Sequence, residues 1–241
     1  MYDQNFYATR HDETGYAANK ILSVLLEQFP YIASAVDIGC GVGTFLSTLR
    51  DRGIEDILGL DGPWVDKSML TIDSEQFISI DLQSPPNLLR KYDLAICLEV
   101  AEHLPSSSAS DLVQYLCNVA DIVLFSAAIP GQGGVNHINE AWQSSWVEHF
   151  VRNGFTVCDS IRPAIWEDKD IYFWYRQNTF VFVKNLNLTS SGYHYPIDLV
   201  HPDLYKSTLR NYELLLKRYT YFSRLKQFFK RLSKKVSHFQ N

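Results

Sequence analysis

The sequence contains no run of apolar residues that approaches the roughly 20 needed to span a bilayer. Its first sixteen residues are polar and acidic, whereas a secretory signal begins with positive charge followed by an apolar stretch. No two cysteines form a C-x-x-C pair, and each lies in or beside an apolar run: Cys40, Cys97, Cys117 and Cys158. These absences argue against a secreted disulfide scaffold and against a cysteine metal site. We therefore expect a cytoplasmic protein whose cysteines are buried, reduced thiols.

Positive charge is scarce over most of the chain. Residues 1–205 carry 12 Lys and Arg against 26 Asp and Glu, whereas residues 206–241 carry 10 against a single acid, Glu213. An enzyme that acts on nucleic acid needs positive charge on the body of its domain. The distribution therefore predicts no nucleic-acid partner for the body, and it leaves the basic C-terminal segment to be explained separately.

Short apolar runs alternate with segments of helical periodicity, a pattern typical of a parallel sheet covered by helices. Buried strands are expected over residues 35–39, 56–61, 77–81, 92–98 and 122–126, with an antiparallel edge hairpin over 155–161 and 178–183. Helices are expected over 17–29, from the following glycine-rich turn to about residue 50, over 106–119 with a serine cap, and over 140–152. The predicted fold is α/β and Rossmann-like, with a seven-stranded, mostly parallel sheet, helices on both faces and a C-terminal helical extension.

The strongest local signal is the segment Val36–Phe45, where Gly39, Gly41 and Gly43 occur as a strand gives way to a helix. Their missing Cβ atoms let the backbone approach a ligand closely, although a plain structural turn is the alternative. The spacing G-x-G-x-G departs from the G-x-G-x-x-G of dinucleotide sites. It therefore argues against a pyrophosphate ligand, which would bind the helix N-terminus.

Carboxylates end the next two predicted strands. Asp61 lies 22 residues beyond Gly39, where it can accept hydrogen bonds from both ribose hydroxyls of an adenosine, a role that also fits NAD. Asp81 ends the third strand, where it can accept from the exocyclic amine of an adenine. The alternative for each acid is a helix N-cap. The glycine spacing and Asp81 together disfavour an NAD-dependent oxidoreductase.

Together these segments resemble the class I S-adenosylmethionine (SAM)-dependent methyltransferases over roughly residues 35–130, through the stretches VDIGCGVGTFL, GLDG, FISIDL and YDLAICLEVAEHLP. The resemblance implies SAM as cofactor and S-adenosylhomocysteine (SAH) as product. It implies that the glycine loop holds the methionine part, that the two acids hold ribose and adenine, and that an N-terminal lid brings Arg10 to the methionine carboxylate. A plain surface arginine is the alternative for Arg10. The cofactor-binding residues expected on this basis are Asp37, Gly39, Cys40, Gly41, Gly43, Asp61, Gly62, Asp81, Leu82, Leu98, Glu99 and Arg10.

A narrower resemblance extends beyond this core, through the stretches FYATRHDETGYAA, LFSAAIPGQGGVNHINEAWQ and WYRQNTFVFV. They are similar to a bacterial group of methyltransferases often associated with surface glycans and secondary metabolites. We expect O-methylation of a small-molecule or carbohydrate-like acceptor by in-line methyl transfer. The alternatives are an N- or C-methyltransferase of the same fold and a non-catalytic SAM-binding partner subunit. The expected organisation is a lid and lead-in helix over residues 1–30, the SAM-binding domain over 31–184 and an extension over 185–241.

Two polar clusters at predicted strand ends are candidates for catalysis. An alcohol acceptor needs a base, and imidazole titrates near neutrality, so His137 is the preferred base and His103 the second choice. Either histidine has the alternative of capping a helix or binding a backbone carbonyl. Glu140 either orients His137 or caps the helix that follows. The H-x-x-E spacing of these two residues also suits a divalent metal, but without a clear third ligand we expect none.

The basic C-terminal segment has an apolar stripe with spacings of three and four residues, typical of an amphipathic helix. Its members are Tyr212, Leu215, Tyr219, Phe222, Leu225, Phe229, Leu232 and Val236. The stripe suits docking on its own domain or on a second subunit, peripheral contact with anionic lipid, or contact with nucleic acid. Aromatic residues of the second half either line an acceptor pocket or belong to the core: Trp142, Trp146, Trp166, Trp174 and Tyr175.

Overall fold

The computed structural model describes residues 4–184 and 197–238, and the chain divides into two compact units, residues 1–199 and 200–241. The strands of the first unit are β1 (Ser34–Ile38), β2 (Asp56–Asp61), β3 (Phe77–Ser79), β4 (Tyr92–Leu98), β5 (Ala120–Ser126), β6 (Phe155–Cys158) and β7 (Phe180–Lys184). Its helices are α1 (Gln4–Gln28), α2 (Thr44–Arg50), α3 (Ala109–Val119), α4 (Gln143–Arg152), α5 (Ile161–Ile165) and α6 (Phe173–Asn178). Short 3-10 turns are η1 (Lys67–Met69), η2 (Ser74–Gln76), η3 (Ala101–His103) and η4 (Ser106–Ser108).

The seven strands form one sheet in the order β3-β2-β1-β4-β5-β7-β6. β7 runs antiparallel to both of its neighbours, and the other pairs are parallel. This confirms the predicted mostly parallel sheet with antiparallel strands at one edge. The chain order reverses between β1 and β4, and ligands of such sheets bind at the carboxyl ends of the strands beside this point.

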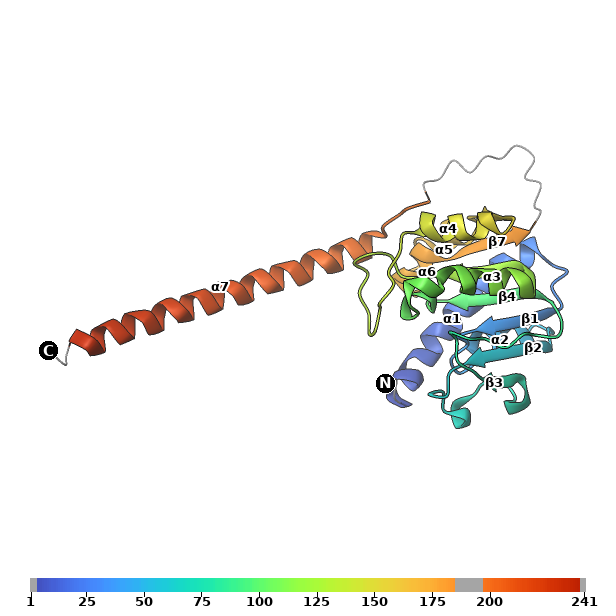
Figure 1. The fold of residues 1–241 in the computed structure, drawn as a ribbon, viewed down its shortest axis with the longest axis horizontal. Helices are drawn as coiled ribbons and strands as arrows, with labels where there is room; N and C mark the ends of the chain where they lie inside the picture. The colour runs from blue at the N-terminus through green and yellow to red at the C-terminus, as the bar shows by residue number, and fades with distance from the viewer. Residues whose placement is uncertain (1–3, 185–196, 239–241) are drawn as a thin grey trace. The chain divides into compact units, whose positions relative to one another are not determined.

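Helices cover both faces of the sheet, as predicted (Figure 1). Successive strand residues point to opposite faces, so Ala35 packs in the cluster that includes α1, α2 and α5, whereas Val36 packs in the cluster that includes α3 and α4. Phe125 lies on the second face, where its ring is 5.2 Å from that of Trp146. Trp146 is therefore a core residue and does not line an acceptor pocket.

Several predicted local features differ in the structure. α1 begins at Gln4, so the segment expected to precede the lead-in helix is part of one continuous helix. Residues 4–28 contain no proline, and the single Gly15 costs a helix only about 1 kcal/mol. The predicted serine cap of the 106–119 helix is wrong, because Ser106–Ser108 form a 3-10 turn and Ser108 makes no side-chain cap. The predicted edge hairpin is not tight, because α5 and α6 separate β6 from β7.

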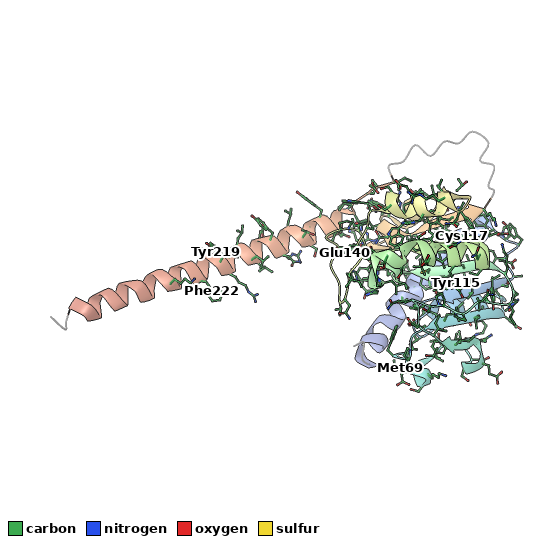
Figure 2. The ribbon with its side chains drawn as sticks, viewed as in Figure 1. Met69, Tyr115, Cys117, Glu140, Tyr219 and Phe222 are labelled. Carbon is green, nitrogen blue, oxygen red and sulfur yellow. The ribbon has the colours of Figure 1, made fainter. Side chains whose placement is uncertain are left out.

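The second unit contains α7 (Pro202–His238), which confirms the predicted C-terminal helix. The described members of the apolar stripe, Tyr212, Leu215, Tyr219 and Phe222, are exposed. Figure 2 labels Tyr219 and Phe222 on α7. The side chains of its later members, Leu225, Phe229, Leu232 and Val236, lie outside the described residues. Within residues 4–184 and 197–238, no helix has the length and apolar content needed to cross a bilayer.

Candidate functional site

The glycine loop joins β1 to α2 with backbone that a side chain would disturb. Gly39 has φ of 83°, and a Cβ there would lie 2.3 Å from Cγ2 of Val100 at the end of β4. Gly43 has φ of 88° and precedes Thr44, the first residue of α2. The loop is fixed to β2, because the Gly39 and Cys40 amides both donate to the carbonyl of Leu60, at 2.7 and 3.2 Å. Bare backbone therefore lies at the carboxyl end of β1, as the motif predicts.

Asp61 ends β2 and ties this strand to the glycine loop. Its Oδ2 accepts from the Gly41 amide at 2.7 Å, and its Oδ1 accepts from the Gly62 amide at 2.6 Å. Burial raises the pKa of Asp61, and these two backbone hydrogen bonds oppose the rise. Trp64 covers the same turn, since a Cβ on Gly62 would lie 2.2 Å from its ring. Trp64 was not predicted as a site residue, and a single exposed tryptophan gave no pattern to detect.

Asp37 and Cys40 are two buried residues on either side of Gly39. Asp37 is buried within β1, and burial followed by the nearby charge of Asp61 raises its pKa well above the usual range. Burial likewise raises the pKa of the Cys40 thiol, which packs against Gly59. Both side chains therefore face the interior of the protein. All four cysteines are free thiols, and Cys158 differs from the prediction in being only partly buried.

Asp81 and Leu82, the two residues expected beside the adenine, differ in burial: Asp81 is exposed and Leu82 is buried. β3 ends at Ser79, so Asp81 lies beyond the strand, where its exposed carboxylate accepts from the Gln83 amide at 2.9 Å. Asp81 thus caps a local turn. Leu82 is buried in the cluster on the α3 side of the sheet. The Ile80 amide donates to the Asp61 carbonyl at 2.8 Å, which keeps this turn next to the end of β2.

Leu98 and Glu99 end β4 with a backbone bend. Glu99 has φ of 54°, a left-handed conformation that costs a residue other than glycine about 1–3 kcal/mol. The surroundings hold it there, because its Oε2 accepts from Gln132 at 3.0 Å and its Oε1 from Asn178 at 3.2 Å. Its own amide donates to the Ser126 carbonyl at 3.0 Å. Burial raises the pKa of Glu99, and these side-chain donors oppose the rise.

Gln132 and Asn178 were not predicted as site residues. They come from the loop after β5 and from the end of α6, and Asn178 also donates to Gln132 Oε1 at 2.9 Å. A sequence signal existed for the second of them. Arg176, Gln177 and Asn178 are consecutive polar residues directly before an apolar strand, and all three are buried. Buried polar side chains of this kind need partners, and here one partner is a carboxylate at the end of β4.

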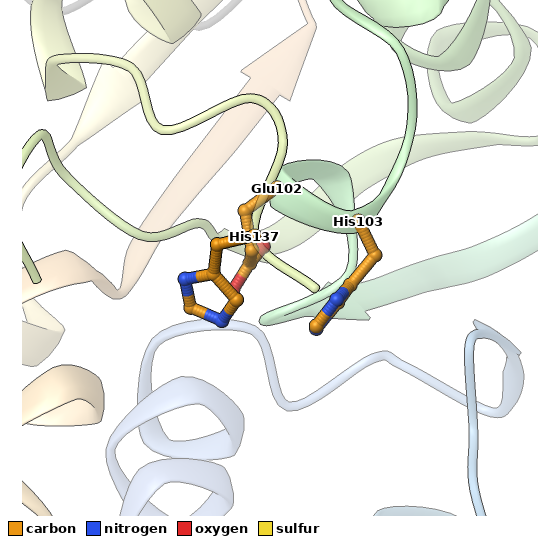
Figure 3. Close-up of side chains that lie close together, drawn as sticks. All are labelled: Glu102, His103 and His137. Carbon is orange, nitrogen blue, oxygen red and sulfur yellow. The ribbon is translucent and has the colours of Figure 1, made fainter. Parts of the chain in front are cut away.

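The catalytic candidates meet because the loop after β5 is bonded to η3 after β4. The amides of Ile138 and Asn139 both donate to the Glu102 carbonyl, at 2.9 and 3.0 Å. This brings the rings of His103 and His137 to 4.9 Å between centroids, nearly perpendicular to each other (Figure 3). Burial, then the proximity of His137, lowers the pKa of His103. The two predicted clusters therefore form a single site.

Glu140, labelled in Figure 2, organises the loop that carries His137. Its carboxylate accepts from the Gly131 amide at 2.7 Å and from the Gly133 amide at 2.8 Å, and it lies 3.2 Å from Nδ1 of His137. It does not cap the next helix, because α4 begins at Gln143. Of the two alternatives for Glu140, the geometry matches the one in which it orients His137.

Glu102 is the remaining polar residue of this site, and it is fully buried. Neither of its carboxylate oxygens has a hydrogen bond of normal geometry among the described residues, and its polar neighbours are the Ala128 backbone and the Glu99 carboxyl group. Burial, then the charge of nearby Glu99, raises the pKa of Glu102 well above its usual range. Arg10 lies in α1 by its backbone, but its side chain falls outside the described residues, so its predicted contact is not tested.

Comparison with known proteins finds methyltransferases, both in sequence and in fold. A family model described as a methyltransferase domain matches residues 9–121. A search of curated proteins finds no match. Solved structures with a similar fold include magnesium protoporphyrin IX methyltransferase (ChlM) from Synechocystis PCC 6803 with bound SAH, at 19% identity and a TM-score of 0.52, covering 71% of this chain and 84% of that one.

Two further structures resemble the chain. DesVI from Streptomyces venezuelae is 16% identical with a TM-score of 0.52, covering 74% of this chain and 95% of DesVI. The sugar N-methyltransferase KedS8 from Streptoalloteichus sp. ATCC 53650 is 13% identical with a TM-score of 0.54, covering 69% of this chain and 86% of KedS8. The sheet order, the glycine loop and the family match thus define a Rossmann-like methyltransferase domain. The family match covers residues 9–121, a little under half of the chain, and the fold is that of these solved methyltransferases.

Proposed function

We propose that this enzyme transfers the methyl group of SAM to a hydroxyl of a small-molecule or carbohydrate-like acceptor. The observation that carries the proposal is the position of the His103–His137 pair at the carboxyl ends of β4 and β5, the edge at which the glycine loop also lies. Similar folds occur in a sugar N-methyltransferase and in a porphyrin methyltransferase. N- or C-methylation therefore remains the alternative within the class. A non-catalytic SAM-binding subunit is the alternative outside it.

The cofactor residues are proposed to act as their motifs imply. The glycine loop would hold the methionine part of SAM, Asp61 and Gly62 the ribose, and Asp81 and Leu82 the adenine. Binding then requires Asp61 to exchange part of its contact with the loop amides for the ribose hydroxyls. Asp37 and Cys40 would complete the cofactor site from β1 and from the loop itself. Leu98 and Glu99 would line the side facing the acceptor, and Arg10 would meet the methionine carboxylate.

His137 is the proposed base. When its Nδ1 donates to Glu140, its Nε2 keeps the lone pair that a proton needs. The acceptor oxygen then attacks the methyl carbon as the bond from that carbon to sulfur breaks, the hydroxyl proton passes to Nε2, and neutral SAH leaves. His103 is the second candidate for this role. We also propose that the enzyme works in the cytoplasm.

Cofactor binding is tested by thermal unfolding of the full chain. SAM and SAH are expected to stabilise it by about 2.7 kcal/mol at a concentration 100 times the Kd, and NAD is expected to have no effect. Asp61→Ala should remove most of this stabilisation, whereas Asp73→Ala, at the exposed N-cap of η2, should retain it. Stabilisation by NAD but not by SAM would contradict the proposal.

The acceptor class is tested by SAH release with nucleotide sugars and polysaccharide fragments as acceptors. SAH release with none of a broad acceptor set would favour the non-catalytic alternative.

The exposed face of α7 is proposed to contact either anionic lipid or a second copy of the chain. Substituting Lys217 and Arg218 by glutamine should weaken binding to phosphatidylserine vesicles roughly 30-fold, because each basic residue contributes about 1 kcal/mol at such a surface. The same change at Lys20 and Lys67, which lie in the first unit, is the control. Vesicle flotation measures the difference. Equal flotation of all three proteins, with a dimer seen by light scattering, would reject lipid in favour of self-association.

A further inference from the structure

Glu102, His103 and His137 form a two-histidine cluster that the function proposed above does not fully use. One possible ligand atom from each residue lies within 4.8 Å of those of the other two (Figure 3). Glu102 and His103 come from η3, and His137 comes from the loop after β5. Because the two histidines are 34 positions apart in the sequence, the cluster exists only in the folded chain. The cluster differs from the predicted His137–Glu140 pair, because its other two members are Glu102 and His103.

Both histidines are held by a partner on Nδ1. His137 Nδ1 lies 3.2 Å from the Glu140 carboxylate, and His103 Nδ1 lies 3.3 Å from the Asn136 carbonyl. Both partners are acceptors, so each Nδ1 carries the proton and each Nε2 keeps its lone pair. Histidine ligands of metal ions show this arrangement, in which a carboxylate or a carbonyl fixes the tautomer and the ring orientation.

Glu102 supplies the anionic member of the cluster. It is 0% exposed, and neither of its carboxylate oxygens has a hydrogen bond of normal geometry among the described residues, although the Ala128 backbone and the Glu99 carboxyl group are close by. A buried polar group without a partner costs about 1–3 kcal/mol, and more when it is charged. A cation held between Glu102 and the two imidazoles would remove this cost. Two other acids lie close to His137 and already have partners, because Glu140 is bound to two backbone amides and Glu99 accepts from Gln132 and Asn178.

We propose that the two-histidine cluster binds one divalent transition-metal ion, through Nε2 of His103, Nε2 of His137 and the Glu102 carboxylate. Two imidazoles with one carboxylate suit zinc or iron(II) better than magnesium or calcium, which prefer oxygen ligands. Zinc binds such nitrogen and oxygen atoms at about 2.0–2.2 Å, so the rings need to rotate slightly inward. Three protein ligands leave coordination positions open for an acceptor.

The role of this ion in catalysis, unlike its binding, rests on the methyltransferase function proposed above. An acceptor hydroxyl that binds the ion loses its proton near neutral pH, as zinc-bound water does. The proton passes to solvent water, the alkoxide attacks the methyl carbon of SAM, and the bond from that carbon to sulfur breaks to give SAH. In this state His137 is a ligand and not a base, because one Nε2 cannot serve both roles. Chelation therefore distinguishes the two mechanisms.

The experiment is a titration of the full, chelator-treated chain with Zn²⁺ by calorimetry and with Co²⁺ by visible absorption. One ion per chain is expected. Metal binding should weaken at least about 100-fold when a ligand is removed, in Glu102→Gln, His103→Ala and His137→Ala. Glu140→Gln should weaken it by about 10–100-fold, because Glu140 holds Nδ1 of the ligand His137. Gly134→Ala tests the site without removing a ligand, because its new methyl would lie 2.2 Å from Nε2 of His137. His149→Ala, on α4, is the control and should bind like the wild type.

Binding that these variants leave unchanged, or no binding at millimolar ion, would overturn the metal proposal. Thermal unfolding of each variant shows whether it is folded, and SAM stabilisation shows whether the cofactor site is intact. Full turnover after chelation would also reject the ion while leaving the methyltransferase proposal and His137 as a base in place. Metal binding without SAM binding would instead contradict the proposed function alone.

Discussion

Gly39→Ala is expected to lose SAM binding more completely than any other single methyl addition in the glycine loop. The new Cβ would lie 2.3 Å from Val100 Cγ2, and the residue would keep φ of 83°. Left-handed backbone costs alanine about 1–2 kcal/mol, and overpacking costs about 1–3 kcal/mol more. If the loop moves to release this strain, SAM affinity falls between about 30-fold and several thousand-fold. Calorimetry measures the loss of SAM affinity, and thermal unfolding measures the loss of stability.

Gly53→Ala is the matched control for this variant. Gly53 has φ of 89°, but nothing lies within 4 Å of a Cβ built there. It should therefore show only the backbone cost of about 1–2 kcal/mol in the free energy of unfolding, with unchanged SAM affinity. SAM affinity in Gly39→Ala equal to that of Gly53→Ala would show that the close approach to Val100 has no role in cofactor binding.

His137→Ala is expected to lower turnover by roughly 10²–10⁴-fold, the usual contribution of a positioned base. SAM binding should persist, because Glu140 still holds the loop through the amides of Gly131 and Gly133. The loop also keeps its two amide hydrogen bonds to the Glu102 carbonyl. SAH release at saturating SAM and acceptor measures the first effect, and calorimetry measures the second.

His149→Ala is the control for the loss of turnover expected in His137→Ala. His149 lies on α4, where its ring packs 6.1 Å from that of Trp146, so its removal should leave turnover unchanged. Near-normal turnover in His137→Ala would remove this residue from the reaction, both as a base and as a metal ligand. An equal loss in both variants would indicate a general effect on folding instead.

The sheet could be predicted from the sequence because its central strands are buried on both faces. Such strands appear as short apolar runs, and β2 and β4 match the predicted ranges at both ends. The glycine loop could be predicted for a related reason, since its backbone conformation restricts the choice of residue. Asp81 shows the limit of the same reasoning. An acid after a short strand suits both a ligand and a turn, and in this structure it caps a turn.

The composition of the site could not be predicted in full, because its parts are joined by tertiary contacts. The pairing of His103 with His137 depends on two amides that share the Glu102 carbonyl, and no periodicity shows that contact. The partners of Glu99 come from positions 33 and 79 residues away in the chain. Polar residues such as Gln132 have no preferred spacing, so only the folded structure identifies them.

The shared carbonyl of Glu102 has a consequence for engineering acceptor choice. It fastens the segment after β5 to the turn after β4, so a displacement of one histidine is transmitted to the other. A graft of residues 129–142 from another methyltransferase should therefore work only when residues 99–103 are transferred with it. Selectivity for the acceptor belongs to the joined pair of segments, and the pair is the unit to exchange.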